Sequence, residues 1–183
     1  MQFRIRRATF EDADAIAAVH VESWKTSYAG IVPDEYLASL DVGARAGMWK
    51  AWLGSPDSLI FVAEDGFGVF GFVGGGRVRE ANSGFAAELY ALYVLREHQN
   101  RGAGRRLTFA LADRLRAEGF ESMLVWVLRE NPAVSFYIHL GGMQIADKTI
   151  EIGGATLEEL AFGWPSLETC FKDKPSCARD NSA

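Results

Sequence analysis

The segment Glu88-Leu-Tyr-Ala-Leu-Tyr-Val94 is followed by Gln99-Asn-Arg-Gly-Ala-Gly104 and then by a leucine-rich stretch that begins at Arg105. The first part is almost continuously apolar, which favours a strand, whereas the leucines after Arg105 recur at the spacing of one helix face. Gly102 and Gly104 let the backbone turn tightly, so that successive N–H groups converge on an anion at the positive end of the helix. The passage therefore predicts a strand, a phosphate-binding loop and a helix.

Arginines at 101, 105 and 106 add positive charge where a pyrophosphate would lie. The spacing is not that of the phosphate loop of nucleoside triphosphatases, because no Gly-Lys-Ser/Thr follows. One glycine is also missing from the dinucleotide-binding fingerprint. The passage thus indicates a different phosphate ligand, and the alternative interpretation is a tight turn with a solvated basic helix face.

The rest of the chain supplies a simple order of elements. Alternating or continuous apolar runs predict strands at 3–8, 59–64, 69–79, 86–94, 122–128, 143–152 and 156–162. Helical spacing and capping residues predict helices at 11–28, 33–40, 41–53, 105–118 and 131–140. This order predicts an α+β fold with a mixed sheet in one domain over residues 1–165, followed by a mobile tail at 166–183.

Composition narrows the class of protein. Of 183 residues, 49% are apolar and 23% are charged, as in soluble globular proteins, and the net charge of −5 argues against a nucleic-acid or anionic-membrane partner. There is no apolar run of membrane-spanning length and no signal-peptide pattern, so we expect a cytoplasmic protein. Cys170, Cys177 and the scattered histidines match no metal-ligand spacing, so no metal is expected.

A second block follows the strand Leu124 to Leu128 and reads Asn131-Pro-Ala-Val-Ser-Phe-Tyr137. The first block, Leu-Tyr-Val followed by Gln-x-x-Gly-x-Gly and a leucine-rich helix, resembles the coenzyme A site of the GNAT superfamily of N-acetyltransferases. The second block resembles the later motif of that family, in which an Asn opens a helix carrying a Tyr near the thioester. The resemblance covers roughly residues 3 to 163.

The resemblance implies a mostly antiparallel sheet that is flanked by helices and splays open between its fourth and fifth strands. Acetyl-CoA would be the cosubstrate, with its pantetheine arm in the gap, held by backbone groups of Leu92 and Val94. A β-bulge, frequent in the fourth strand of this family, would change the face that Glu88 takes. The resemblance places the pyrophosphate at Gln99, Asn100, Arg101, Gly102, Ala103, Gly104, Arg105 and Arg106, and the rest of the cofactor beside Asn131, Ala133, Phe136 and Tyr137.

Acetyl transfer to an amine needs a base, because an alkylamine with a pKa of about 10 is mostly protonated at neutral pH. Glu88 is the first candidate, since it lies in an apolar strand where burial would raise its pKa. The alternative interpretation of Glu88 is a surface carboxylate. Some relatives carry an acid in the strand where this chain has Trp126, which leaves Glu88, Glu22 or a bound water for the task.

Two further roles are predicted around the reacting atoms. Tyr137 matches the tyrosine of the family motif and would protonate the leaving thiolate, although a core tyrosine is the alternative. His20, Trp24 and Tyr28 fall on one stripe of the first predicted helix and would line the acceptor pocket. A packed core stripe would show the same spacing.

The leading hypothesis is therefore an N-acetyltransferase that acts on a primary amine by direct attack in a ternary complex. A catalytically silent acyl-CoA-binding sensor or partner module is the alternative. The acceptor is open between small-molecule and peptide amines, and a homodimer formed through the last strands is compatible with the sequence.

Overall fold

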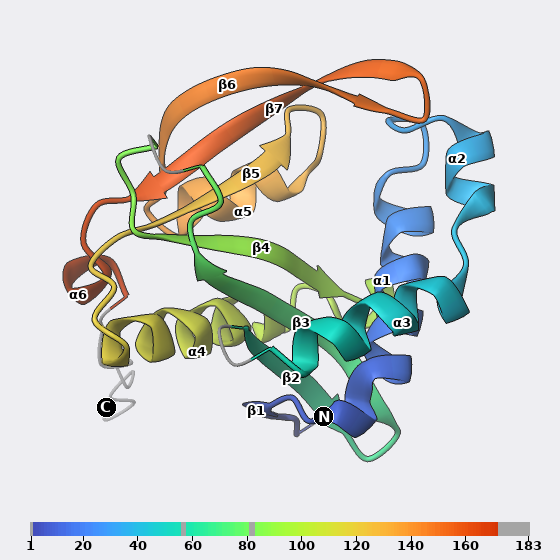
Figure 1. Ribbon diagram of the computed structural model, residues 1–183, viewed down its shortest axis with the longest axis horizontal. Coiled ribbons are helices and arrows are strands. Elements are labelled where there is room, and N and C mark those ends of the chain that lie inside the picture. Colours follow the sequence, from blue (N-terminus) through green and yellow to red (C-terminus); the bar gives the residue numbers. More distant parts are fainter. Residues whose placement is uncertain (1, 56–57, 81–82, 172–183) are drawn as a thin grey trace, which may run out of the picture.

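The computed structural model describes residues 2–55, 58–80 and 83–171, and its strands form one sheet in the order β1-β2-β3-β4-β5-β7-β6 (Figure 1). The strands are β1 (Arg4–Arg7), β2 (Leu59–Asp65), β3 (Gly68–Arg77), β4 (Ala87–Val94), β5 (Met123–Leu128), β6 (Met143–Ile152) and β7 (Ala155–Trp164). The helices are α1 (Ala13–Ser27), α2 (Asp34–Ser39), α3 (Val42–Leu53), α4 (Ala103–Ala117), α5 (Ala133–His139) and α6 (Leu167–Cys170), with short 3-10 helices η1 (Phe10–Asp12) and η2 (Arg96–His98).

The pairing of β4 with β5 is the only parallel pairing among the described strands. It joins Ala87–Leu89 to Met123–Val125 and then stops, although β4 continues to Val94 and β5 to Leu128. The mixed, mostly antiparallel sheet and its opening between the fourth and fifth strands are confirmed.

Helices cover both faces of this sheet. One layer is formed by α1 and α3, where Ile16 and Trp49 pack with Phe72 of β3. On the opposite face, the leucines of α4 at 107, 111 and 115 are fully buried against β2, β3 and β4. This burial explains the apolar stripe that predicted α4, because each buried leucine contributes about 2 kcal/mol.

A β-bulge interrupts β4 at Tyr90, as the family resemblance implied. Gly74 of β3 is opposite Ala91 and Gly75 is opposite Leu89, so that Tyr90 is the extra residue. The bulge reverses the alternation of β4 beyond this point. It lies where the pairing between β4 and β5 has just ended.

Several boundaries differ from the predictions. Helix α4 begins at Ala103 instead of Arg105, because Gly102 itself adopts a left-handed conformation and starts the helix. The packed core also continues beyond the boundary predicted at residue 165, since Leu167 is buried and Phe171 packs against Phe109 and Trp164. The rest of the predicted tail, 172–183, lies outside the described residues.

Within the part of the chain that the structure describes, no helix has both the length and the apolar character needed to cross a bilayer.

The hairpin of β6 and β7 extends across the molecule towards α2 (Figure 1). Its turn is Gly153-Gly154, as predicted, and both glycines have positive φ angles, of 58° and 81°. Gly153 lies against α2, because a Cβ atom at Gly153 would be 2.7 Å from Cβ of Tyr36. The hairpin tip is therefore held against the helical N-terminal third of the chain. Strand β6 is the free edge of the sheet, and the homodimer through the last strands stays a prediction.

Replacing Gly153 with Ala should destabilise the protein more than the same change at Gly154. At both positions an Ala residue would have to adopt a left-handed backbone conformation, which costs about 1–2 kcal/mol. Only the Cβ atom of Gly153→Ala also overlaps a neighbour, Tyr36, and this overlap costs roughly a further 1–3 kcal/mol. A Cβ atom at Gly154 meets nothing within 4 Å. Urea unfolding of the two variants would measure the difference, and equal losses would show that the hairpin tip is not held against Tyr36.

Candidate functional site

The opening between β4 and β5 is a cavity of about 720 Å³. Its walls come from the end of β4, the loop before α4, the first residues of α4, β5 and α5. Most of the cofactor-binding residues predicted from the sequence line it, namely Leu92, Val94, Gln99, Asn100, Gly102, Gly104, Arg105, Asn131, Ala133, Phe136 and Tyr137.

The first turn of α4 is suited to an anion. Asn100 and Gly102 have positive φ angles of 59° and 81°, which turn the chain into the helix. The first hydrogen bond of α4 runs from the Arg106 amide to the Gly102 carbonyl, so the preceding amides have no acceptor within the helix. Gly104 keeps this end open, because a Cβ atom there would be 3.4 Å from the Phe136 ring. The residues present therefore fit a phosphate-bearing cofactor.

Three predicted cofactor residues do not line this cavity. Ala103, the first residue of α4, is buried in the core, and Arg101 is exposed outside the cavity. The Arg106 guanidinium turns towards β1, where it donates to the Phe3 carbonyl at 3.3 Å and lies 4.4 Å from the Phe3 ring centre. Arg96, which the sequence analysis did not single out, lines the cavity instead. The sequence could have indicated this role, because Arg96 comes directly after the apolar strand that ends at Val94.

Two of the predicted residues also organise the cavity wall. The Asn131 side-chain oxygen accepts a hydrogen bond from the Ala133 amide at 2.8 Å, which fixes the start of α5. The Gln99 side chain donates to the Val94 carbonyl at 2.9 Å, which ties the phosphate-binding loop to the end of β4. These bonds hold the loop and α5 at the two sides of the cavity.

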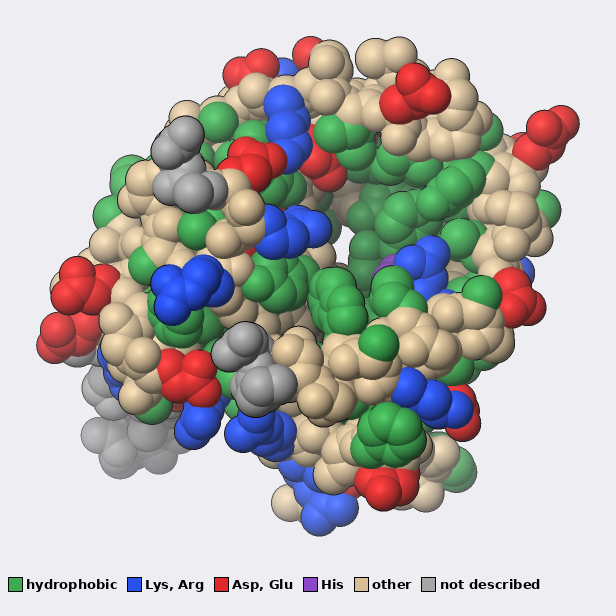
Figure 2. Space-filling view, viewed as in Figure 1, with side chains coloured by type: hydrophobic (Ala, Val, Ile, Leu, Met, Phe, Trp, Pro, Cys, Tyr) green, Lys and Arg blue, Asp and Glu red, His purple; other side chains and the backbone are tan. Residues whose placement is uncertain are grey.

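A second cavity, of about 410 Å³, meets the first. The two share Tyr28, Tyr90, Tyr93, Trp126 and Val127, so they join at a largely aromatic wall. Figure 2 shows the molecule hollowed at its centre, with hydrophobic side chains around the opening. We call the larger space the donor cavity and the smaller one the acceptor cavity, after the roles that we propose for them.

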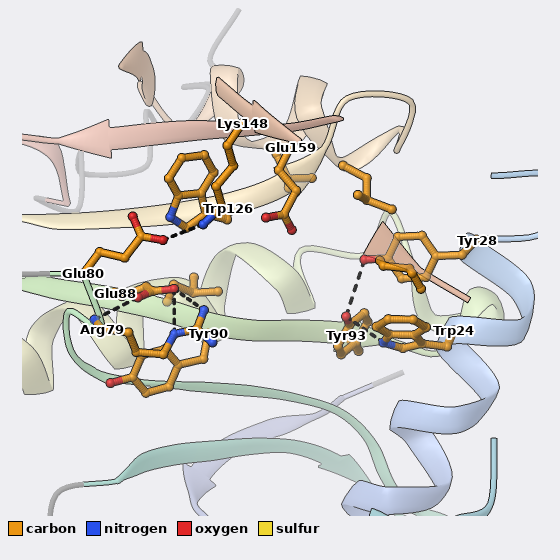
Figure 3. Close-up of a pocket in the computed structure, with 14 residues that line it drawn as sticks. Trp24, Tyr28, Arg79, Glu80, Glu88, Tyr90, Tyr93, Trp126, Lys148 and Glu159 are labelled. Carbon is orange, nitrogen blue, oxygen red and sulfur yellow. Dashed lines mark hydrogen bonds and ion pairs between the residues drawn. The ribbon is translucent and has the colours of Figure 1, made fainter. Parts of the chain in front are cut away.

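Trp24 and Tyr28, which the sequence predicts to bind the acceptor, line the smaller of the two cavities together with Tyr93. The Trp24 indole N–H donates to the Tyr93 hydroxyl at 2.8 Å, and the Tyr28 and Tyr93 hydroxyls are 3.4 Å apart (Figure 3). Burial raises the pKa of both tyrosines, so they remain neutral hydroxyl groups at physiological pH. They place polar atoms where the two cavities meet.

His20 does not line either cavity, contrary to the expectation. Its ring stacks on Tyr93 with 5.0 Å between ring centres, and its Nδ1 accepts a hydrogen bond from the Trp49 indole at 3.2 Å. Burial lowers the pKa of His20 to about 3, so the ring is neutral. His20 therefore packs against Tyr93 in the core. For this residue the alternative interpretation, a packed core position, is the one that the structure shows.

Glu88 lines the acceptor cavity and is fully buried. Both of its oxygens are engaged by Arg79, through the backbone N–H at 3.1 Å, through Nε at 3.1 Å and through Nη2. The Arg79 guanidinium also lies 5.1 Å from the Tyr90 ring centre. Glu22, the other carboxylate considered as a base, is exposed on α1 and lines neither cavity.

Charged residues of the last hairpin also enter the acceptor cavity, and the sequence analysis missed them. Lys148 of β6 pairs with Glu80 at 2.6 Å and lies 3.8 Å from the Trp126 ring centre. Glu159 of β7 points into the same space (Figure 3). The sequence did contain an indication of an inward-facing carboxylate. Successive side chains of a strand face opposite sides of the sheet, so one residue of the pair Glu158-Glu159 had to point inwards.

Arg79→Ala should destabilise the protein, because it leaves the buried Glu88 carboxylate with only the backbone N–H of residue 79. We expect the free energy of unfolding to fall by about 2 kcal/mol, as for loss of a hydrogen bond to a charged group. Arg77→Ala is the matched control, since its exposed side chain contacts the Phe120 ring. Urea unfolding should show that the loss disappears when Glu88→Gln is already present, and a loss that persists there would contradict this account.

Comparison with known proteins agrees with this geometry. A model described as the acetyltransferase (GNAT) family matches residues 20–141, more than half of the chain. The chain is 43% identical over 166 residues to YuaI, an uncharacterised N-acetyltransferase of Bacillus subtilis (strain 168), covering 89% of this chain and 93% of that protein. It is 25% identical over 150 residues to a spermidine N(1)-acetyltransferase of Thermoplasma acidophilum, covering 80% and 91%.

The fold is similar to that of the PaiA N-acetyltransferase of Thermoplasma acidophilum, a crystal structure in complex with coenzyme A. The TM-score is 0.66 and the identity 23%, with 87% of this chain and 98% of that chain covered. The resemblance seen in the two sequence blocks is confirmed. The chain therefore belongs to the acetyltransferase (GNAT) family and is an acyltransferase.

Proposed function

We propose that this enzyme transfers the acetyl group of acetyl-CoA to a primary amine by direct attack within a ternary complex. The observation that carries the proposal is the meeting of two cavities at a shared aromatic wall. One cavity has a helix N-terminus and glycines at its wall, and the other has carboxylates. Two substrates bound in them would bring their reacting groups together without a covalent enzyme intermediate.

The donor cavity offers a site for each part of the cofactor. Acetyl-CoA supplies the acetyl group as a thioester. The amides of the first turn of α4, with Arg105, would hold the pyrophosphate, because they combine N–H donors, the helix dipole and a positive charge. Backbone groups of Leu92 and Val94 would hold the pantetheine arm, since β4 has no pairing with β5 at this level.

Tyr137 is the proposed donor of a proton to the leaving thiolate. It lines the donor cavity, and burial raises its pKa well above the usual range for tyrosine. The side chain is therefore protonated throughout the physiological range and has a proton to give.

The acceptor is proposed to be a small cationic amine. Three carboxylates and two cationic side chains line the acceptor cavity, and its walls are aromatic, which suits an ammonium group on an organic chain. The similarity to a spermidine N(1)-acetyltransferase supports the same class of acceptor. Of the bases considered from the sequence, Glu88 lies in this cavity, and it could accept a proton only if Arg79 released one of its oxygens.

A panel of amines tests the proposed function directly. Spermidine, lysine, glucosamine and a tetrapeptide with a free N-terminus would each be mixed with acetyl-CoA, and release of the free thiol would be followed. We expect at least one polyamine-like amine to be turned over, with the acetylated amine found by mass spectrometry. Acetyl-CoA should also raise the melting temperature. Binding of acetyl-CoA with no turnover of any amine would instead favour the silent acyl-CoA-binding alternative.

Arg105→Ala should weaken coenzyme A binding, whereas Arg106→Ala should not. Arg105 lines the donor cavity, but the adjacent Arg106 turns away towards Phe3. Loss of one charged contact to phosphate corresponds to about 1.5–3 kcal/mol, or roughly a tenfold or larger rise in Kd. Isothermal titration calorimetry with coenzyme A would measure both variants. Equal Kd values for Arg105→Ala and the wild type would place the pyrophosphate elsewhere.

A further inference from the structure

The charges that line the acceptor cavity do not balance. Its carboxylates are Glu80, Glu88 and Glu159, and its cations are Arg79 and Lys148. Arg79 is bound to Glu88, and Lys148 is bound to Glu80. The Glu159 carboxylate has no hydrogen bond or ion pair with any described residue, so the cavity presents one unmatched negative charge.

Glu159 lies where an incoming amine would pass. It sits on β7, opposite Leu128 of β5 on one side and Lys148 of β6 on the other. Figure 3 shows its carboxylate pointing from β7 into the space between Trp126 and Tyr93, towards β4. Both aromatic residues belong to the wall shared with the donor cavity. A group held by Glu159 would therefore be close to the junction of the two cavities.

We infer that Glu159 binds the acceptor amine as its ammonium ion and takes the proton that must leave before attack. This inference rests on the proposed function and names the residue that carries its first step. Glu88 is then a positioning residue, because it holds Arg79 in place while both of its oxygens are occupied.

The protons and bonds balance without a further reactant. The ammonium group gives one proton to the Glu159 carboxylate, and the neutral nitrogen forms a bond to the acetyl carbon. The carbon–sulfur bond breaks, and the sulfur leaves as a thiolate that accepts a proton from the Tyr137 hydroxyl. The second proton of the nitrogen restores Tyr137, and Glu159 returns its proton to solvent through the open acceptor cavity.

The surroundings of Glu159 favour this role. Burial raises its pKa above the usual range for a glutamate, and the nearby carboxylates of Glu88 and Glu80 raise it further. Lys148 and Arg79 act in the opposite direction but do not cancel the effect. The neutral Tyr28 side chain lines the same cavity as Glu159. A carboxylate with a raised pKa is a stronger base than an exposed one and lies closer to the pH at which it must work.

The test compares Glu159→Gln with Glu158→Gln, using the panel amine that the wild-type enzyme acetylates best. Glu158 is the matched control, because it is adjacent, pairs with Arg129 and has a side chain that is 53% exposed. We expect kcat/KM for the amine to fall about 100-fold in Glu159→Gln and to stay near the wild-type value in Glu158→Gln. In Glu159→Gln, kcat/KM should rise about tenfold per pH unit, because only the amine already deprotonated in solution can react. The wild-type profile should be flatter.

Two further measurements separate this role from a structural one. Acetyl-CoA should raise the melting temperature of Glu159→Gln as much as that of the wild type. The raised pKa means that the folded protein favours the protonated form of Glu159. Protonated Glu159 therefore stabilises the fold at pH values below the ordinary glutamate pKa, and this contribution is lost as the pH rises through the raised pKa of the folded state. At pH 8 Glu159→Gln should therefore melt no lower than the wild type.

The outcomes are distinguishable. Wild-type values of kcat/KM and an unchanged pH profile in Glu159→Gln would overturn the inference while leaving the proposed function intact. A wild-type enzyme that acetylates no amine of the panel would overturn the proposed function and this inference together.

Discussion

Three parallel residue pairs join β4 to β5, and the rest of the site depends on the pairing ending there. Beyond Leu89 and Val125 the two strands share no ladder, so both leave backbone groups at the wall of the donor cavity. The bulge at Tyr90 lies at this point and turns the end of β4. Helix α4 covers one face of the paired region, and its first turn is thereby brought to the mouth of the opening. The same divergence creates the donor cavity and orients the helix N-terminus that we propose to bind the cofactor phosphates.

The charged side chains that line the acceptor cavity differ in whether they have a partner of opposite charge. A buried carboxylate is costly unless it is paired and hydrogen-bonded, and Glu88 meets that condition through Arg79. Lys148 pairs with Glu80, whose side chain is 55% exposed, and also covers the Trp126 ring. The Glu88–Arg79 pair, joined by three hydrogen bonds, fixes one part of the cavity wall. The remaining carboxylate, on β7, has the freedom to interact with something that is not part of the protein.

Local patterns were sufficient to predict the elements but not the long-range neighbours of each side chain. The glycine loop, the leucine stripe of α4 and the Gly153-Gly154 turn each follow from short-range stereochemistry, so they were predicted closely. The position of His20 depends on Trp49 and Tyr93, which come from α3 and β4, and no helical spacing contains that information. The pairing of Glu88 with Arg79 likewise depends on a loop between strands. Charges on the last hairpin could be placed only once its register against β5 was known.

The contact between the Gly153-Gly154 turn and Tyr36 has a consequence for how this enzyme could diversify. It joins the last hairpin to the N-terminal helices. These two parts add Trp24, Tyr28, Lys148, Ile152 and Glu159 to the wall of the acceptor cavity, whereas the donor cavity is built mainly from the middle of the chain. Substitutions in the hairpin can reshape the acceptor cavity without altering the loop before α4. A lineage can therefore exchange one acceptor for another while inheriting its means of binding the acetyl donor unchanged.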